Sequence, residues 1–193
     1  MAVRPAFADP VLDSQRTFRA VLDAMAHPGR VLTVHGPEGP SPLGPATTAV
    51  CLTLLDFDTP LWLDAAAATS QTVSYLRFHC GVPLVDAPGA ARFALSVDAG
   101  ALASLDAFDA GTDERPDLST TLVLQVDGLG VERGRRLRGP GIAGETRLTV
   151  RGAPWLWDAV RANGARFPRG IDVVLCAGAR LAALPRTVRA ETD

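Results

Sequence analysis

Hydrophobic and polar positions follow two rhythms along this chain, one typical of helices and one typical of strands. The first helical pattern has large apolar residues at the i, i+3, i+4, i+7 spacing of one helix face, at Phe18, Val21, Leu22 and Met25. Asp13 or Ser14 can cap the start of this helix. Pro28 disfavours helical dihedrals at the residue before it, so we expect the helix to end near Ala26.

The strand rhythm is clearest near the end of the chain. Apolar side chains dominate residues 171–176, where Asp172 occupies one alternate position, and Gly178 supplies a turn before a second apolar run at residues 181–184. The pattern predicts a strand, a tight turn and a second strand, followed by Pro-Arg-Thr at residues 185–187. One carboxylate is therefore expected within a strand of core character.

The remaining segments alternate between helix and strand. Further helices are predicted at residues 45–55, about 69–79, 101–108 and 154–163. Further strands are predicted at residues 30–34, 61–63, 84–85, 92–97 and 121–126, around residue 137, and at residues 148–150. This alternation predicts a single domain over residues 1–193, an α/β three-layer α/β/α sandwich with a mixed β-sheet.

The composition excludes several kinds of chemistry. All 19 basic residues are arginine, so the chain contains no lysine. A pyridoxal phosphate (PLP) enzyme needs a lysine amine for its Schiff base, and a Walker P-loop or a protein kinase needs a lysine at the phosphates. None of these sites can be built here, and no directly bound cofactor is expected.

Charge, cysteine usage and hydropathy indicate where the protein works. A net charge of -2 with interspersed signs argues against a general nucleic-acid binder. Cys51, Cys80 and Cys176 lie in apolar segments and form no CxxC pair, which favours buried, reduced thiols. Because there is no run of about 18 uncharged apolar residues and no signal-like start, we expect a cytoplasmic protein without a membrane span.

Asp172 is the first candidate functional residue, because a carboxylate in a core strand must be paired, hydrogen-bonded or neutralised. Arg169 or Arg186 could supply the partner in a structural ion pair, which we favour over a ligand-binding role. Arg186 and Thr187 also offer a guanidinium fork and a hydroxyl. These groups could hold a phosphonate or triphosphate oxygen, or form an interface contact.

Two further polar groups each have two interpretations. Gly139 and Gly141 flank Pro140 and could bring backbone close to an anion, but proline removes one donor, so a structural turn is favoured. His79 could cap the end of its helix, which is the favoured interpretation, or form a polar site with Arg77.

Charged clusters give no metal or catalytic site. Alternation places Arg136 and Arg138 on one side of a strand, and a solvated hairpin edge is favoured for the cluster Arg133, Arg135, Arg136 and Arg138. Asp56 and Asp58 could present carboxylates to magnesium, but an ordinary turn is favoured. The histidines are too scattered for zinc, and no catalytic residue is predicted.

The order of the sequence blocks resembles one protein family. The blocks are FRAVLDAMAHPGRV, ATTAVCLTLLDFDTPLWL, LRFHCGVPLV, TTLVLQV, GPGI and FPRGIDVVLCAGARLAALPRT. Their order and spacing resemble the PhnH family, whose members are subunits of the bacterial carbon-phosphorus lyase core complex of phosphonate metabolism. The resemblance covers nearly the whole chain, and its departures lie in loops at residues 36–42 and 110–118.

The resemblance implies a reduced version of the PLP-dependent transferase fold without the cofactor. It also implies an accessory subunit, without activity alone, that acts with subunits G, I and L when ribose triphosphate is transferred from ATP to methylphosphonate and adenine is released. ATP is then a substrate of the complex, and catalysis is expected mainly on the I protein. The family further implies a homodimer in isolation and assembly with subunits G, I and J.

Two other classes of function remain open from the sequence. One is an enzyme that acts alone on a phosphorylated small molecule. The other is a regulatory module that binds a nucleotide or a phosphonate.

Overall fold

The structure is a computed structural model that describes residues 4–191 of the 193-residue chain. In chain order its elements are α1 (Pro10–Ala26), β1 (Leu32–Thr33), α2 (Pro45–Leu54), β2 (Leu61–Leu63), α3 (Ser70–Cys80), β3 (Phe93–Ser96), β4 (Thr121–Gln125), β5 (Gly128–Arg138), β6 (Thr146–Arg151), α4 (Leu156–Gly164), β7 (Asp172–Ala177), β8 (Arg180–Leu184) and β9 (Arg189–Ala190), with short 3-10 helices at Pro88–Ala90 and Pro116–Leu118. Within residues 4–191, no helix combines the length and the apolar character that a membrane span needs.

Six strands form one mixed sheet in the order β1-β8-β7-β4-β3-β2. Strands β2, β3, β4 and β7 are parallel, whereas β8 pairs antiparallel with both β7 and β1. A smaller antiparallel sheet has the order β6-β5-β9. The predicted α/β class and mixed sheet are confirmed, while the likeness to the PLP-dependent transferase fold stays a prediction.

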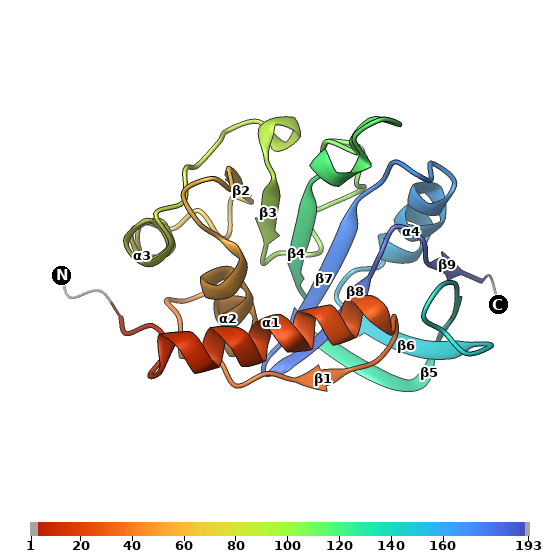
Figure 1. The fold of residues 1–193 in the computed structure, drawn as a ribbon, viewed down its shortest axis with the longest axis horizontal. Coiled ribbons are helices and arrows are strands. Elements are labelled where there is room, and N and C mark those ends of the chain that lie inside the picture. The colour runs from red at the N-terminus through yellow and green to blue at the C-terminus, as the bar shows by residue number, and fades with distance from the viewer. Residues whose placement is uncertain (1–3, 192–193) are drawn as a thin grey trace.

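The main sheet separates two hydrophobic cores. In β4 and β7, Val123 and Val174 face the core that includes α1, α2 and α3, whereas Leu122 and Leu175 face the core that includes α4 and the smaller sheet. Figure 1 shows α1 crossing in front of α2 and β8. The strands are covered on both faces, as their unbroken apolar runs predict. The result is a three-layer sandwich whose third layer is partly β-sheet.

Helix α1 ends at Ala26 as predicted but begins at Pro10, earlier than expected. Its N-cap is Asp9, whose carboxylate accepts hydrogen bonds from two backbone N–H groups of the first turn. Pro10 suits the first helical position because that residue needs no N–H partner. The prediction of Asp13 or Ser14 as the cap is therefore wrong.

The single apolar face predicted for α1 is divided in the structure. Val21 is buried, whereas Phe18 and Leu22 are 46% and 51% exposed. The buried face runs through Thr17, Val21 and Ala24, and α1 contacts α2 and β8. Large apolar residues therefore lie on the outside of this helix as well as beneath it.

Residues 101–108 form turns and bends, so the helix predicted there is wrong. The Asp98 carboxylate accepts hydrogen bonds from two backbone N–H groups that follow it, and the Trp155 indole N–H donates to a backbone carbonyl at 2.6 Å. These bonds fix the turn that leads into the segment. Within it, the Phe108 N–H donates to the Leu105 carbonyl at 3.2 Å, and the buried side chains of both residues pack into the core.

Several strand predictions change in extent, and one short strand was not predicted. Residues 84–85 contribute only a single bridge to β2, and residue 137 belongs to the long strand β5. The two residues of β9 pair with the end of β5. A strand of two residues has no periodic signal, so the hydrophobic pattern cannot predict it.

The three thiols are free, and they lie in or against the core between the helices and the main sheet. Cys51 and Cys176 are buried, and Cys80 is partly buried. Burial raises the pKa of the Cys176 thiol to about 12 and the pKa of the Cys80 thiol to about 11. These thiols therefore keep their protons at neutral pH and are poor nucleophiles.

We expect the thiols to react slowly with a thiol-specific disulfide reagent at pH 8 in the native protein and rapidly in urea. A Ser74→Cys variant places a thiol at an exposed position of α3 and provides the fast control. The free energy of unfolding should also fall as the pH rises above the ordinary thiol pKa, because only the unfolded chain then releases these protons. Native thiols that react at the control's rate would contradict their burial.

Candidate functional site

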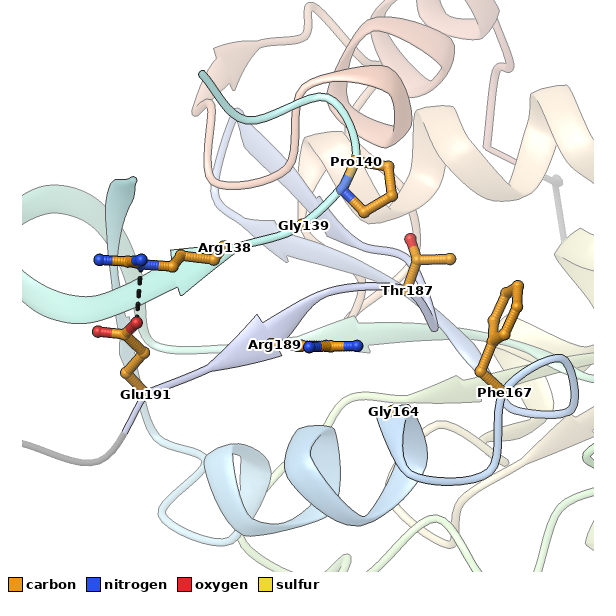
Figure 2. Close-up of a pocket in the computed structure, with 8 residues that line it drawn as sticks. All are labelled: Arg138, Gly139, Pro140, Gly164, Phe167, Thr187, Arg189 and Glu191. Carbon is orange, nitrogen blue, oxygen red and sulfur yellow. Dashed lines mark ion pairs between the residues drawn. The ribbon is translucent and has the colours of Figure 1, made fainter. Parts of the chain in front are cut away.

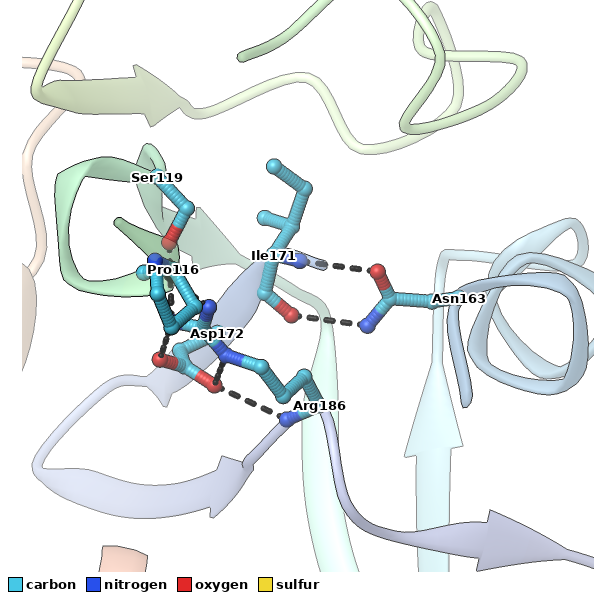
Figure 3. A network of polar contacts seen from close by, with 6 residues as sticks. All are labelled: Pro116, Ser119, Asn163, Ile171, Asp172 and Arg186. Carbon is cyan, nitrogen blue, oxygen red and sulfur yellow. Dashed lines mark hydrogen bonds and ion pairs between the residues drawn. The ribbon is translucent and has the colours of Figure 1, made fainter. Parts of the chain in front are cut away.

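The Pro-Arg-Thr segment after β8 is fixed to the start of β7 by an ion pair. Arg186 Nη2 lies 2.5 Å from Asp172 Oδ2, and Arg186 Nε donates to Asp172 Oδ1 at 3.2 Å. The backbone N–H of Arg186 donates to the same Oδ1 at 2.8 Å. Figure 3 shows the two side chains facing each other. Of the two arginines expected as partners, Arg186 holds Asp172, while Arg169 pairs with Asp113.

The Arg186 guanidinium has two further protein partners. Nη1 donates to the Pro116 carbonyl at 2.7 Å, and Nη2 donates to Ser119 Oγ at 2.8 Å. The side chains of Arg186 and Asp172 are only 15% and 18% exposed. Because most of the guanidinium donors are used within the protein, this geometry favours the structural interpretation of the pair.

A second polar clamp, which the sequence reasoning missed, joins α4 to the start of β7. The buried Asn163 amide donates to the Ile171 carbonyl at 2.8 Å and accepts from the Ile171 N–H at 2.8 Å (Figure 3). A Cβ on Gly170 would lie 2.8 Å from Asn163 Oδ1, so the glycine makes room for this clamp. The available signal was an amide three residues after Val160, on the inner face of the helix.

A cleft of about 570 Å³ lies where the end of α4, the end of β5 and the segment that leads into β9 meet. Figure 2 shows its lining residues: Arg138, Gly139, Pro140, Gly164, Phe167, Thr187, Arg189 and Glu191. The fold thus brings together Gly139 and Thr187, two residues that the sequence analysis named from distant blocks.

One arginine of the cleft is paired with a carboxylate, whereas a second arginine and a hydroxyl remain available to a ligand. Arg138 Nε lies 2.7 Å from Glu191, which satisfies that guanidinium. Within residues 4–191, the Arg189 guanidinium and the Thr187 hydroxyl have no hydrogen-bond partner. Phe167, 63% exposed, adds an aromatic surface beside them. A cation, a hydroxyl and an aromatic ring can bind an anionic small molecule or an acidic side chain of another protein.

The two glycines of the Gly-Pro-Gly segment have different surroundings. Gly139 has φ +143, and a Cβ there would lie 3.0 Å from the Thr187 carbonyl. Gly141 has φ +80, and a Cβ there would lie 1.9 Å from the carbonyl oxygen of Ala26, so Gly141 packs on the end of α1. A backbone bond from the Ile142 N–H to the Gly139 carbonyl closes the turn at 3.2 Å. Nothing lies within 4 Å of a Cβ at Gly144.

Arg77 and His79 belong to α3 and are not among the residues that line the cleft. The predicted cap role of His79 is wrong, because the end of α3 is capped by Gly81, which adopts φ +67 and donates its N–H to the Arg77 carbonyl. His79 Nε2 instead lies 2.9 Å from the Arg4 carbonyl, so it holds the segment before α1.

The remaining charged clusters have structural partners. Arg136 and Arg138 lie on the same side of β5, as predicted, and both pair with Glu145 and Glu191. Asp56 closes the predicted turn by accepting the backbone N–H of the second residue after it at 2.9 Å. In the part of the chain that the structure describes, no group of His, Cys, Asp or Glu has metal-binding geometry.

Asp64 is a buried carboxylate that the sequence reasoning missed. Its Oδ2 accepts hydrogen bonds from Ser96 Oγ at 2.8 Å and from the backbone N–H groups of Val97 and Asp98 at 2.8 and 3.0 Å. Its Oδ1 accepts from a backbone N–H at 2.6 Å. These bonds join the ends of β2 and β3, so Asp64 is a structural acceptor.

We expect Asp172→Asn to lower the free energy of unfolding by about 2 to 3 kcal/mol, because it leaves the Arg186 guanidinium without its ionic partner. The Arg169–Asp113 pair is a matched control, since its side chains are 50% and 72% exposed. Asp113→Asn should cost less than about 1 kcal/mol. Urea unfolding measures both variants, and equal small losses would mean that the Asp172 pair is worth no more than a surface ion pair.

A family model and two known proteins align with this sequence over most of its length. The family model of PhnH, described as a bacterial phosphonate metabolism protein, matches residues 5–191. The chain is 43% identical over 194 residues to the alpha-D-ribose 1-methylphosphonate 5-triphosphate synthase subunit PhnH of Rhizobium meliloti (strain 1021), covering 97% of this chain and 95% of that protein. It is 33% identical over 175 residues to HtxG of Stutzerimonas stutzeri, described as a candidate C-P lyase subunit protein, covering 90% of this chain and 83% of that one. The matched residues include the cleft and the Asp172–Arg186 pair, and the chain belongs to the bacterial PhnH family of phosphonate metabolism proteins.

Proposed function

We propose that this chain is an accessory subunit of a carbon-phosphorus lyase complex in alkylphosphonate catabolism. The observation that carries the proposal is the match, over 97% of the chain, to a protein named as a subunit of alpha-D-ribose 1-methylphosphonate 5-triphosphate synthase. The second relative, described as a C-P lyase subunit protein, supports the same role.

In this role the chain acts with subunits G, I and L when ribose triphosphate is transferred from ATP to methylphosphonate and adenine is released. ATP is a substrate of the complex, and this chain binds no cofactor of its own. The family resemblance supports these partners, together with a homodimer in isolation and assembly with subunits G, I and J. The free thiols are in keeping with a place in the cytoplasm.

We expect the pure chain to release no adenine from ATP and methylphosphonate, and to restore adenine release when added to subunits G, I and L. Chromatographic measurement of adenine tests both statements. A mixture of G, I and L without this chain is the control. Adenine release by this chain alone would support a stand-alone enzyme instead.

A second candidate function, a ligand-binding regulatory module, is favoured by one observation. The Arg189 guanidinium and the Thr187 hydroxyl belong to residues that line an open cleft and, within residues 4–191, these two groups have no hydrogen-bond partner. A phosphate or phosphonate oxygen would satisfy both groups.

For this second candidate we expect saturable binding of ATP or methylphosphonate by the isolated chain in calorimetric titrations. Arg189→Ala should weaken the binding about 10-fold or more, since a hydrogen bond to a charged group contributes about 1.5 to 3 kcal/mol. Arg16→Ala, on α1, is the control. If neither ligand gives a saturable heat of binding, the cleft is not their binding site, and contact with another protein is the remaining role for it.

A further inference from the structure

Helix α1 has a second apolar face that the described part of the chain, residues 4–191, leaves exposed. The face that packs on α2 and β8 contains Thr17, Val21 and Ala24. The outer face of α1, as we call it here, contains four large apolar side chains with these exposed fractions: Val11 77%, Leu12 46%, Phe18 46% and Leu22 51%. Scattered exposed apolar residues are ordinary, but several on one helix mark an interaction surface.

The outer face has the spacing of a helix-packing seam. Val11, Gln15, Phe18 and Leu22 follow one another at intervals of four, three and four residues. This spacing keeps side chains in line along a helix and is the one used where two helices pack side by side. Figure 1 shows α1 lying lengthwise across the outside of its layer, and the side chains of the seam are exposed.

The charge left without a close partner beside the seam is positive, because Asp23, one turn after Arg19, already pairs with His27 and Arg30. The Arg16 side chain is 75% exposed, and its ion pair with Asp13 is a loose one of 3.4 Å. Arg19 is exposed and, within residues 4–191, has no ion-pair partner. Both arginines lie near the middle of the 17-residue helix. A second copy of α1, packed antiparallel on the seam about Phe18, would bring the two Arg19 side chains to the same side, which is unfavourable.

We propose that the outer face of α1 docks an amphipathic helix of another subunit, one that supplies an apolar stripe to Val11, Phe18 and Leu22 and carboxylates to Arg16 and Arg19. The inference rests on the proposed role of this chain as a subunit of a complex. It goes further by naming the surface and the chemistry of the partner. Burial of the apolar side chains supplies affinity, and the arginines set the orientation and the choice of partner.

The test uses a tagged chain that is co-expressed with the other subunits proposed above. We expect Phe18→Glu and Val11→Glu each to lower the recovery of the contacting subunit about 10-fold or more, because a charge is placed in the buried seam. Phe57→Glu is the matched control, since Phe57 is 74% exposed outside α1. Circular dichroism and thermal melting establish that the variants are folded. If Phe18→Glu is unstable, Val11→Glu provides a second, independent variant of the same surface.

Charge variants test the acidic partner. Arg19→Glu should reduce recovery and Arg19→Lys should retain it, with the loss smaller at high salt. A photoreactive residue at position 15 should cross-link to a helix of the contacting subunit that carries Asp or Glu. Cross-linking to a second copy of this chain, or to a basic or non-helical segment, would overturn the proposal.

The two proposals fail in different ways. If the wild-type chain recovers no other subunit, the subunit role itself is wrong, and the docking surface is rejected with it. If the wild-type, Phe18→Glu and Val11→Glu chains all recover the same subunits equally, the subunit role stands and the outer face of α1 is not the docking surface.

Discussion

The short connection from β8 to β9 depends on how Arg186 is held. Its guanidinium and its backbone N–H both bond to Asp172 at the start of β7, while further donors reach Pro116 and Ser119. The chain therefore leaves the main sheet in a fixed direction. It then passes along the cleft at Thr187 and adds β9 to the smaller sheet. The Asp172–Arg186 ion pair, at the junction between β8 and β9, therefore helps to position both the cleft and the third layer.

The sequence was most informative where the determining contacts are local. The β7–β8 hairpin depends on alternation and on a glycine turn within the same stretch, and the end of α1 depends on the proline that follows it. The Asp172–Arg186 pair was also predictable, because the two residues occupy the ends of that hairpin. Each of these features is decided by residues fewer than about 15 positions apart in the sequence.

The features that the sequence did not predict depend on contacts between distant segments. The turn before residues 101–108 is held partly by the indole of Trp155, and the cleft forms only when the end of β5 meets the segment before β9. Asn163 and Asp64 are polar residues whose partners are mostly backbone groups. The helical spacing places Asn163 on the inner face of α4, but side-chain spacing does not reveal which backbone group such a residue bonds. Tertiary packing, rather than local propensity, decides these elements.

The surroundings of the glycines in the β5–β6 hairpin have a practical consequence. Gly141 leaves no room for a side chain against the last turn of α1, whereas Gly144 faces open space. Within a few residues the hairpin thus changes from a closely packed segment to a free tip. An epitope or a fluorescent label inserted at residue 144 therefore avoids the last turn of α1, whereas one inserted at residue 141 would disrupt it.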